Sequence, residues 1–327
     1  MEYRRLQRSK GGSFLLSLPK EWVLKNGLQG GSVIQLIEGE GGALTIRLGE
    51  EAEPERGATA VIRDPKGLER QIRACYLMGA DTIVVDLGMR MTPATREEIR
   101  AAIHKLIGLE IVEETSSGMT IQCLLQPSSM PVKSTLRRAY TLAANMHKEA
   151  EQALINGDLE LAESVSRRDD EVDRLYFLLV RQLRLALRNA PIAEKIGVKP
   201  AECLELRMAA KYIENIADYS EAVATSVGKI DRRELDRETL DALSSLSALA
   251  YSLHEEAAQA LFKQDIEITE RVMARGKELP EKLLAVNELL VDKQSRIAAL
   301  LDSVALYFYQ IGGHGVDMAE LVSGTAL

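Results

Sequence analysis

The sequence predicts an α+β multidomain protein of 327 residues. Short apolar segments separated by glycine-containing turns fill residues 1–48, a pattern typical of small antiparallel sheets. Strand-like and helix-like segments alternate over 58–126, which favours a small α/β module. From residue 132 onward, apolar residues recur every three or four positions, the period of an α-helix. The expected domains are 1–49, 58–126, 132–230 and 235–323.

Composition indicates a soluble cytoplasmic protein. The net charge is −8, so the chain as a whole is not a general polyanion binder. Its cysteines, Cys75, Cys123 and Cys203, show no CxxC spacing, which argues against a disulfide framework and for a reducing compartment. The chain has no apolar run long enough for a membrane span and no apolar signal-peptide core, so neither a span nor export is expected.

The first fifty residues predict a dimerisation domain. Strands are expected over 13–18, 32–38 and 44–48, with a short helical turn over 20–26 and a glycine turn at 41–42. So few residues bury too little apolar surface to fold alone, and dimerisation is the usual remedy. The segments LPKEW, LQGGSVIQL and LTIRL resemble the SpoVT/AbrB-like swapped-hairpin domain. This resemblance implies an intertwined homodimer, which in many family members binds DNA.

A basic patch in the same domain supports contact with DNA. Residues 1–30 hold six cations against two acids, a local excess of four positive charges. This is the distribution that a phosphate-contacting module needs. The candidate DNA-binding residues are Arg4, Arg5, Arg8, Lys10 and Lys20. The alternative is a dimerisation domain whose cations are simply solvated.

Residues 49–57 are acidic and contain Pro54, so they predict a linker into the α/β module. Within the module the expected order is strand, helix, strand, helix, strand, strand. The corresponding ranges are 59–63, 67–78, 82–87, 93–107, 110–115 and 119–125. The module contains no phosphate loop, nucleophile elbow or metal-ligand spacing, and a structural or dimer-extending role is the fair interpretation.

The helical part contains an internal repeat. Sliding the sequence by 107 positions aligns HKEAEQALINGDLE, from His147, with HEEAAQALFKQDIE, from His254. Each copy is expected to hold three helices joined by short connections, which gives two tandem antiparallel three-helix bundles. The expected helices are 132–156, 158–189 and 198–228, followed by 235–263, 265–290 and 291–322.

Two acid pairs at helical spacing lie in the first copy, Asp169 with Asp173 and Glu214 with Asp218. Residues four apart share one face of a helix, so each pair points two carboxylates the same way. Asp169 also occupies a slot in an apolar stripe, where a buried unpaired carboxylate is costly. A hard cation with several oxygen ligands would turn this repulsion into a binding site. The alternative is that Arg167, Arg168, Arg174 and Arg207 neutralise the acids.

The tandem units and their segments DDEVDRL and YIENIADYSEAVA resemble PhoU over residues 132–324. Joined to the AbrB-like start, the whole chain resembles the archaeal PhoU-like phosphate uptake regulators. This resemblance implies that Asp169, Asp173, Glu214 and Asp218 ligate a divalent or trivalent metal ion. On hardness, all-oxygen ligation fits Mg, Ca or Mn, whereas the family implies Fe or Zn clusters as well.

The second copy departs from the acid pattern. Gly276 and Pro280 replace the first pair, and Tyr309 and Gly313 stand where Glu214 and Asp218 stood. We therefore predict one metal site per chain, and Pro280 is expected to kink or interrupt its helix. His314 and Asp317 remain nearby, where packing and capping roles are favoured.

The resemblance implies a regulator of phosphate uptake or phosphate metabolism rather than an enzyme, with phosphate transporter or signalling components as partners. A second hypothesis is a stand-alone AbrB-type transcription factor with the helical bundles as its effector sensor. A third, a di-metal hydrolase, is least favoured, because such sites usually need histidines or an open water position, and His147 is the only histidine in the first bundle.

Overall fold

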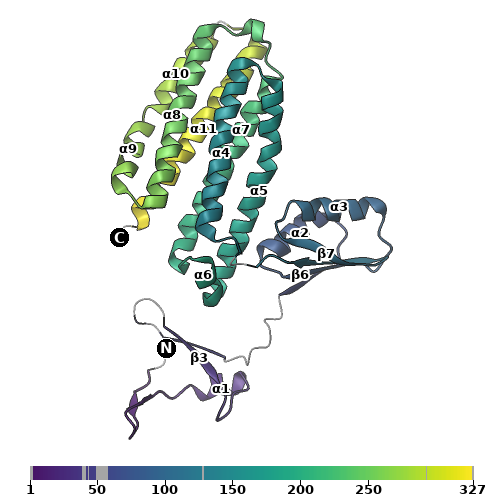
Figure 1. Ribbon diagram of the computed structural model, residues 1–327, viewed down its shortest axis with the longest axis vertical. Helices are drawn as coiled ribbons and strands as arrows, with labels where there is room; N and C mark the ends of the chain where they lie inside the picture. Colours follow the sequence, from purple (N-terminus) through teal and green to yellow (C-terminus); the bar gives the residue numbers. More distant parts are fainter. Residues whose placement is uncertain are drawn as a thin grey trace. The chain divides into compact units, whose positions relative to one another are not determined.

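A computed structural model describes residues 3–38, 42, 44–48, 58–126, 129–291 and 293–325. The predicted linker 49–57 and Gly41 lie outside the described residues. The chain divides into two compact units, residues 1–57 and 58–327. It is a mixed α+β protein that is mostly helical, with small sheets (Figure 1).

The N-terminal unit contains two antiparallel strand pairs, β1 with β2 and β3 with β4, and one short helix, α1. Their bounds are β1 Gln7–Arg8, β2 Phe14–Leu15, α1 Lys20–Lys25, β3 Ile34–Glu38 and β4 Leu44–Leu48. The predicted elements are confirmed, although the first strand was not predicted. No side chain over residues 3–36 and 44–46 is buried, and apolar side chains such as Phe14, Leu24 and Leu36 are more than half exposed.

The α/β module begins the second unit. Its strands lie in the order β5-β6-β8-β7, with β5 parallel to β6 and β8 antiparallel to both of its neighbours. Helices α2 and α3 cover one face of this sheet, and a core of its own fills the space between (Figure 1). The bounds are β5 Thr59–Ile62, α2 Leu68–Leu77, β6 Thr82–Asp86, α3 Pro93–His104, β7 Leu109–Glu114 and β8 Gly118–Cys123. All six elements were predicted.

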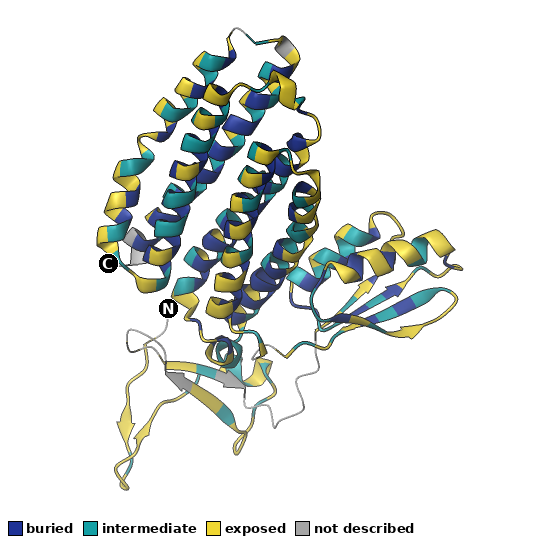
Figure 2. Cartoon of the chain, turned by 45° about the horizontal axis from the view of Figure 1, so that its top comes forward, coloured by how far each residue is buried: buried dark blue, intermediate teal, exposed yellow. Residues whose placement is uncertain are grey.

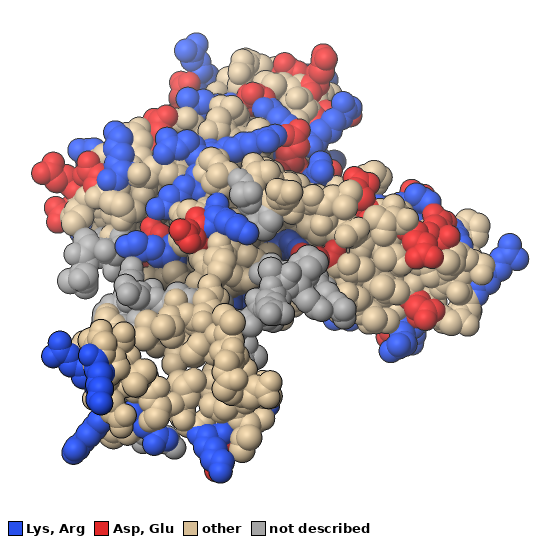
Figure 3. Space-filling view, turned by 60° about the horizontal axis from the view of Figure 1, so that its bottom comes forward, with Lys and Arg blue, Asp and Glu red and all other residues tan. Residues whose placement is uncertain are grey.

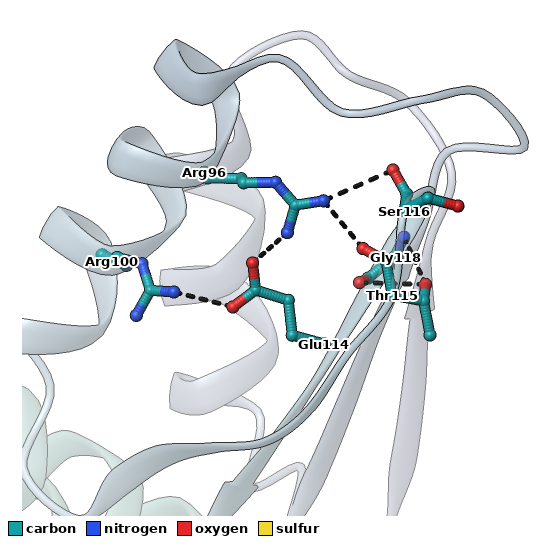
Figure 4. A network of polar contacts seen from close by, with 6 residues as sticks. All are labelled: Arg96, Arg100, Glu114, Thr115, Ser116 and Gly118. Carbon is teal, nitrogen blue, oxygen red and sulfur yellow. Dashed lines mark hydrogen bonds and ion pairs between the residues drawn. The ribbon is translucent and has the colours of Figure 1, made fainter.

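A polar network fastens the β7–β8 turn to α3 (Figure 4). Arg96 and Arg100 both donate to the Glu114 carboxylate, and Arg96 also donates to the Thr115 carbonyl at 2.8 Å. Gly118 follows this turn at a close approach to β6. A Cβ added there would lie 2.7 Å from the Val85 carbonyl oxygen, so a larger residue would not fit without a shift.

Eight α-helices follow the module in the described residues of the second unit. Their bounds are α4 Val132–Asn156, α5 Leu159–Arg188, α6 Ala190–Ile196, α7 Cys203–Val227, α8 Arg237–Lys263, α9 Ile266–Gly276, α10 Leu279–Leu290 and α11 Ser295–Thr325. Pro280 interrupts the predicted helix 265–290, as expected, because it lies in the first turn of α10 and starts a new helix. Helix α6 was not predicted.

The two predicted three-helix units share one hydrophobic core rather than enclosing one each. Buried side chains of every long helix, from Val132 to Val322, belong to a single cluster. Helices α7 and α11, the last of each unit, pack against each other, and α4 contacts α8. The buried residues, dark blue in Figure 2, lie on the inward faces of the helices. Small residues on these faces allow the two units to close into one bundle.

The repeat is preserved at the helix ends. Asp158 caps α5 by accepting from Leu161 N–H, and its equivalent Asp265 caps α9 by accepting from Ile268 N–H. Gly157 and its equivalent Gln264 both end the preceding helix with a left-handed backbone, at φ 65° and 57°. The α4–α5 and α8–α9 turns are therefore the same structure built from different residues.

Candidate metal centre

The candidate metal centre lies between α5 and α7, which pack antiparallel. Helix α5 presents Asp169 and Asp173 toward α7, because the apolar residues Val165 and Val172 on the same stripe are fully buried. Helix α7 presents Glu214 and Asp218 from the border of its buried face. The structure thus brings the predicted pairs to one place.

Three of the four predicted acids form the tight group. One carboxylate oxygen from each of Asp173, Glu214 and Asp218 lies within 4.8 Å of the others. Glu214 is buried and the two aspartates are partly buried. Asp169 lies just outside this group, yet its Oδ1 is buried and has no hydrogen-bond partner.

The acids perturb one another. Burial first, and then the carboxylates of Asp218 and Asp173, raise the pKa of Asp169 to about 7. Burial and Glu214 raise the pKa of Asp218 to about 6, and the same two causes raise the pKa of Asp173. Excluded water and like charge thus both oppose ionisation.

Three of the four arginines named as possible neutralising partners bond elsewhere, and the fourth, Arg174, is exposed. Arg167 pairs with Glu163, and Arg168 pairs with Glu149. Arg207 donates to the Tyr176 hydroxyl at 2.7 Å. Within the described chain, no arginine forms an ion pair with any of the four acids. The nearest compensating cation is Lys211, which bonds Glu214.

Sequence reasoning missed two residues of this site. Glu221 adds a further carboxylate that raises the pKa of both Asp169 and Asp218. It lies three residues after Asp218, a spacing that places it on the same face of α7. Lys211 lies three residues before Glu214, so the same spacing could have identified it.

The residues present fit a hard cation. Carboxylate oxygens of Asp173, Glu214 and Asp218 converge, and the neighbouring Asp169 Oδ1 is buried without a hydrogen-bond partner. Among the described residues, Lys211 is the cation that pairs with one of these carboxylates. Such a donor set would hold a cation that prefers oxygen ligands. Asp173, Glu214 and Asp218 would supply the first ligands. Asp169, whose carboxylate interacts with those of Asp173 and Asp218, would add negative charge beside the cation.

The equivalent place in the second copy is filled by packing. A Cβ at Gly276, which replaces Asp169, would lie 2.5 Å from a methyl of Val316 on α11. His314 bonds Asn215 at 3.1 Å and Asp317 at 3.3 Å, and stacks against the rings of Tyr212 and Tyr219. Close helix packing and an aromatic stack occupy this region in place of carboxylates.

The candidate DNA-binding residues all lie in the N-terminal unit. Arg4 and Arg5 precede β1, Arg8 belongs to β1, Lys10 follows it, and Lys20 begins α1; all five are exposed. Lys and Arg side chains project from this unit on the face that Figure 3 shows. In the described residues, no helix is long and apolar enough to cross a bilayer.

Comparison with known proteins identifies the helical part. Residues 136–227 match the family model of the PhoU domain. The crystal structure of PhoU from Pseudomonas aeruginosa superposes with a TM-score of 0.52 at 19% identity, covering 58% of this chain and 93% of that one. The phosphate transport system regulatory protein PhoU from Streptococcus pneumoniae superposes with a TM-score of 0.50 at 12% identity, covering 60% and 94%.

No curated protein sequence matches the chain. The structural likeness shows a shared fold, and the family match covers α4, α5 and α7, the helices that carry the acid cluster. Residues 136–227 are therefore similar to the PhoU domain, and the helical region shares the fold of the two PhoU structures.

Proposed function

We propose that this chain is a cytoplasmic, non-enzymatic regulator that adjusts phosphate uptake or phosphate metabolism to phosphate supply. The observation that carries the proposal is the acid cluster inside the matched domain, whose carboxylates lack arginine partners. The regulatory role is inferred from the similarity to the phosphate transport system regulatory protein of Streptococcus pneumoniae. The three cysteines are free, which fits a reducing compartment.

The cluster would hold one metal ion per chain, with Fe, Zn, Mg and Mn as the candidates. Bound metal would supply the positive charge that the carboxylates lack. Because the metal ion would join α5 to α7, its binding would raise the free energy of unfolding of the helical region. The exposed faces of the bundle would contact phosphate transporter or signalling components.

The N-terminal unit would form a swapped-hairpin homodimer. Its exposed apolar residues, and the lack of any buried side chain among its described residues, support association with a second copy. Its cations support contact with DNA. An AbrB-type transcription factor with the bundle as effector sensor is accordingly the second candidate function.

Elemental analysis of purified protein beside the Asp169→Ala/Asp218→Ala variant tests the metal site, with Asp241→Ala as a control for an exposed acid on α8. We expect about one metal equivalent in wild type and control and none in the double variant, with a lower midpoint of unfolding in the variant. Equal metal content in all three proteins would show that these acids do not bind the metal.

Phosphate uptake in cells lacking the gene tests the regulatory role. Wild-type protein should restore phosphate-dependent control of uptake, and the double variant should not. Salt-dependent binding to DNA upstream of its own gene, abolished by Arg5→Ala/Arg8→Ala, would instead favour the transcription factor.

A further inference from the structure

A second polar feature of the bundle lies away from the acid cluster, in a groove between α4 and α8. The groove has a volume of about 340 Å³ and is lined by Arg137, Tyr140, Thr141, Glu255, Ala258, Gln259, Phe262 and Lys263. A second hollow of about 520 Å³ shares Arg137 and Thr141 and adds Lys133 and Arg138. Four cations therefore border one continuous surface.

Lys133 pairs with Glu202 at 2.8 Å, but the other three cations differ from those elsewhere on the bundle. Arg168 pairs with Glu149 and Arg275 with Glu256, whereas Arg137 lies 4.4 Å above the ring of Phe262. In the described part of the chain, no carboxylate forms an ion pair with Arg137, Arg138 or Lys263, although the protein has more acids than bases. The Glu255 carboxylate accepts from Tyr251 at 3.1 Å. Unpaired cations beside a hollow attract an anion.

The groove also leads into a buried hydrogen-bond chain. The Tyr140 hydroxyl lies 3.1 Å from His254 Nδ1, His254 Nε2 lies 3.0 Å from His147 Nδ1, and His147 Nε2 lies 3.0 Å from Ser247 Oγ. Ser247 donates its own hydrogen to Glu151. Tyr140 is the member of this chain that also lines the groove.

The direction of the chain follows from its last bond. Because Ser247 uses its hydrogen on Glu151, its oxygen accepts from His147 Nε2–H, and His147 Nδ1 must then accept from His254 Nε2–H. His254 Nδ1 is left as an acceptor, so the Tyr140 hydroxyl donates to it. If an anion in the groove accepts the hydroxyl hydrogen of Tyr140, the hydrogen bond from Tyr140 to His254 Nδ1 is broken.

We propose that the groove binds a phosphoryl dianion, held by Arg137 and Lys263, with the Tyr140 hydroxyl turning from His254 to donate to it. Arginine presents a planar fork that matches phosphoryl oxygens, whereas the Thr141 hydroxyl already donates to the Arg137 carbonyl at 2.9 Å. The hollow has room for inorganic phosphate or for a phosphate monoester such as a nucleotide. The inference deepens the proposed function, on which the choice of phosphoryl over other anions rests.

Nitrogen NMR of protein labelled with ¹⁵N-histidine tests this, since the chain has 4 histidines and single His→Gln variants assign them. Inorganic phosphate and AMP are titrated separately at constant ionic strength. We expect a saturable shift of the His254 ring nitrogens, with the exposed His104 unmoved. Tighter binding of AMP identifies a phosphate ester, and equal or tighter binding of phosphate identifies the free ion.

Arg137→Ala should weaken this binding at least tenfold, whereas Arg167→Ala, which removes an arginine already paired with Glu163, should not change it. The proposed phosphoryl site is wrong if neither ligand shifts the His254 nitrogens, or if Arg137→Ala has the same dissociation constant as wild type. The titration repeated on Asp169→Ala/Asp218→Ala separates the two sites. A shift that persists there belongs to the groove even if metal binding fails, and a shift lost there assigns phosphate to the acid cluster.

Discussion

His147 Nδ1 and His254 Nε2 are joined by a hydrogen bond of 3.0 Å, and the two histidines are equivalent positions of the internal repeat. Their outer partners are equivalent as well, because Tyr140 bonds His254 while Ser247, its counterpart 107 residues later, bonds His147. The two equivalent imidazoles thus meet where α4 packs against α8. A polar pair with one satisfied arrangement fixes the register of α4 on α8.

A double-mutant cycle tests this pairing. His147→Leu leaves the His254 Nε2–H buried without an acceptor. His254→Leu leaves His147 Nδ1 without its donor and the Tyr140 hydroxyl without its acceptor. Each single variant should lower the free energy of unfolding by about 2–3 kcal/mol. The double variant should cost at least about 0.5 kcal/mol less than the sum, because it removes both partners. Strict additivity in urea unfolding would show that the two rings are not coupled.

The same pair predicts a loss of stability in acid. Burial lowers the pKa of His147 to about 3 and that of His254 well below its usual value. Below about pH 6.5 the unfolded chain binds protons at these rings and the folded chain does not, so the free energy of unfolding falls as pH decreases, by about 1.4 kcal/mol per pH unit for each ring. Comparison with His147→Gln/His254→Gln between pH 7 and pH 4 isolates this slope, which the variant should lack.

Much of this architecture follows from sequence periodicity. The three and four spacing predicts the long helices to within a few residues, and the Asp169 and Glu214 pairs predict which faces of α5 and α7 meet. Local spacing does not report contacts between distant helices. The alignment of His147 with His254 showed a repeat, but nothing in it showed that the two rings form a hydrogen bond with each other.

The same limit explains the shared core. Gly312 and Gly315 read as helix-weakening residues in sequence, yet both mark places where α11 packs closely against other helices. Likewise, the position of Asp169 beside the group formed by Asp173, Glu214 and Asp218 depends on how α5 is rotated against α7. Spacing along one helix cannot supply that angle.

Two glycines of α11 give a matched test of this packing. A Cβ at Gly315 would lie 2.6 Å from the backbone nitrogen of His254 and 2.9 Å from its Cα, and helix backbone cannot move aside cheaply. Gly315→Ala should therefore destabilise the protein by about 2 kcal/mol. Gly313 has nothing within 4 Å of an added Cβ, so Gly313→Ala should stabilise it by about 0.5–1 kcal/mol through helix propensity. Thermal unfolding of the two variants should move in opposite directions.

Arg181 joins the α/β module to the bundle. Its guanidinium is buried and donates at 2.8 Å to the carbonyls of Tyr76 and Ala80 and at 2.7 Å to the Asp81 carboxylate. Because the Tyr76 carbonyl belongs to the last turn of α2 and the Ala80 carbonyl follows the helix, the cation also complements the negative end of α2. One side chain of α5 thereby holds the end of α2 and the start of β6, and α5 is the helix that carries Asp169 and Asp173.

Arg181→Met should therefore cost about 3 kcal/mol, since it leaves buried acceptors unmet at a joint with few other polar contacts. Hydrogen exchange should locate the loss in α2 and β6 before it reaches α7. Arg184→Met is the matched control, because Arg184 is exposed and reaches the Leu77 carbonyl only at 3.4 Å, so its change should stay within about 0.5 kcal/mol. If both variants unfold alike, with exchange rising evenly over the bundle and the module, Arg181 contributes packing alone and the module needs no anchor to α5.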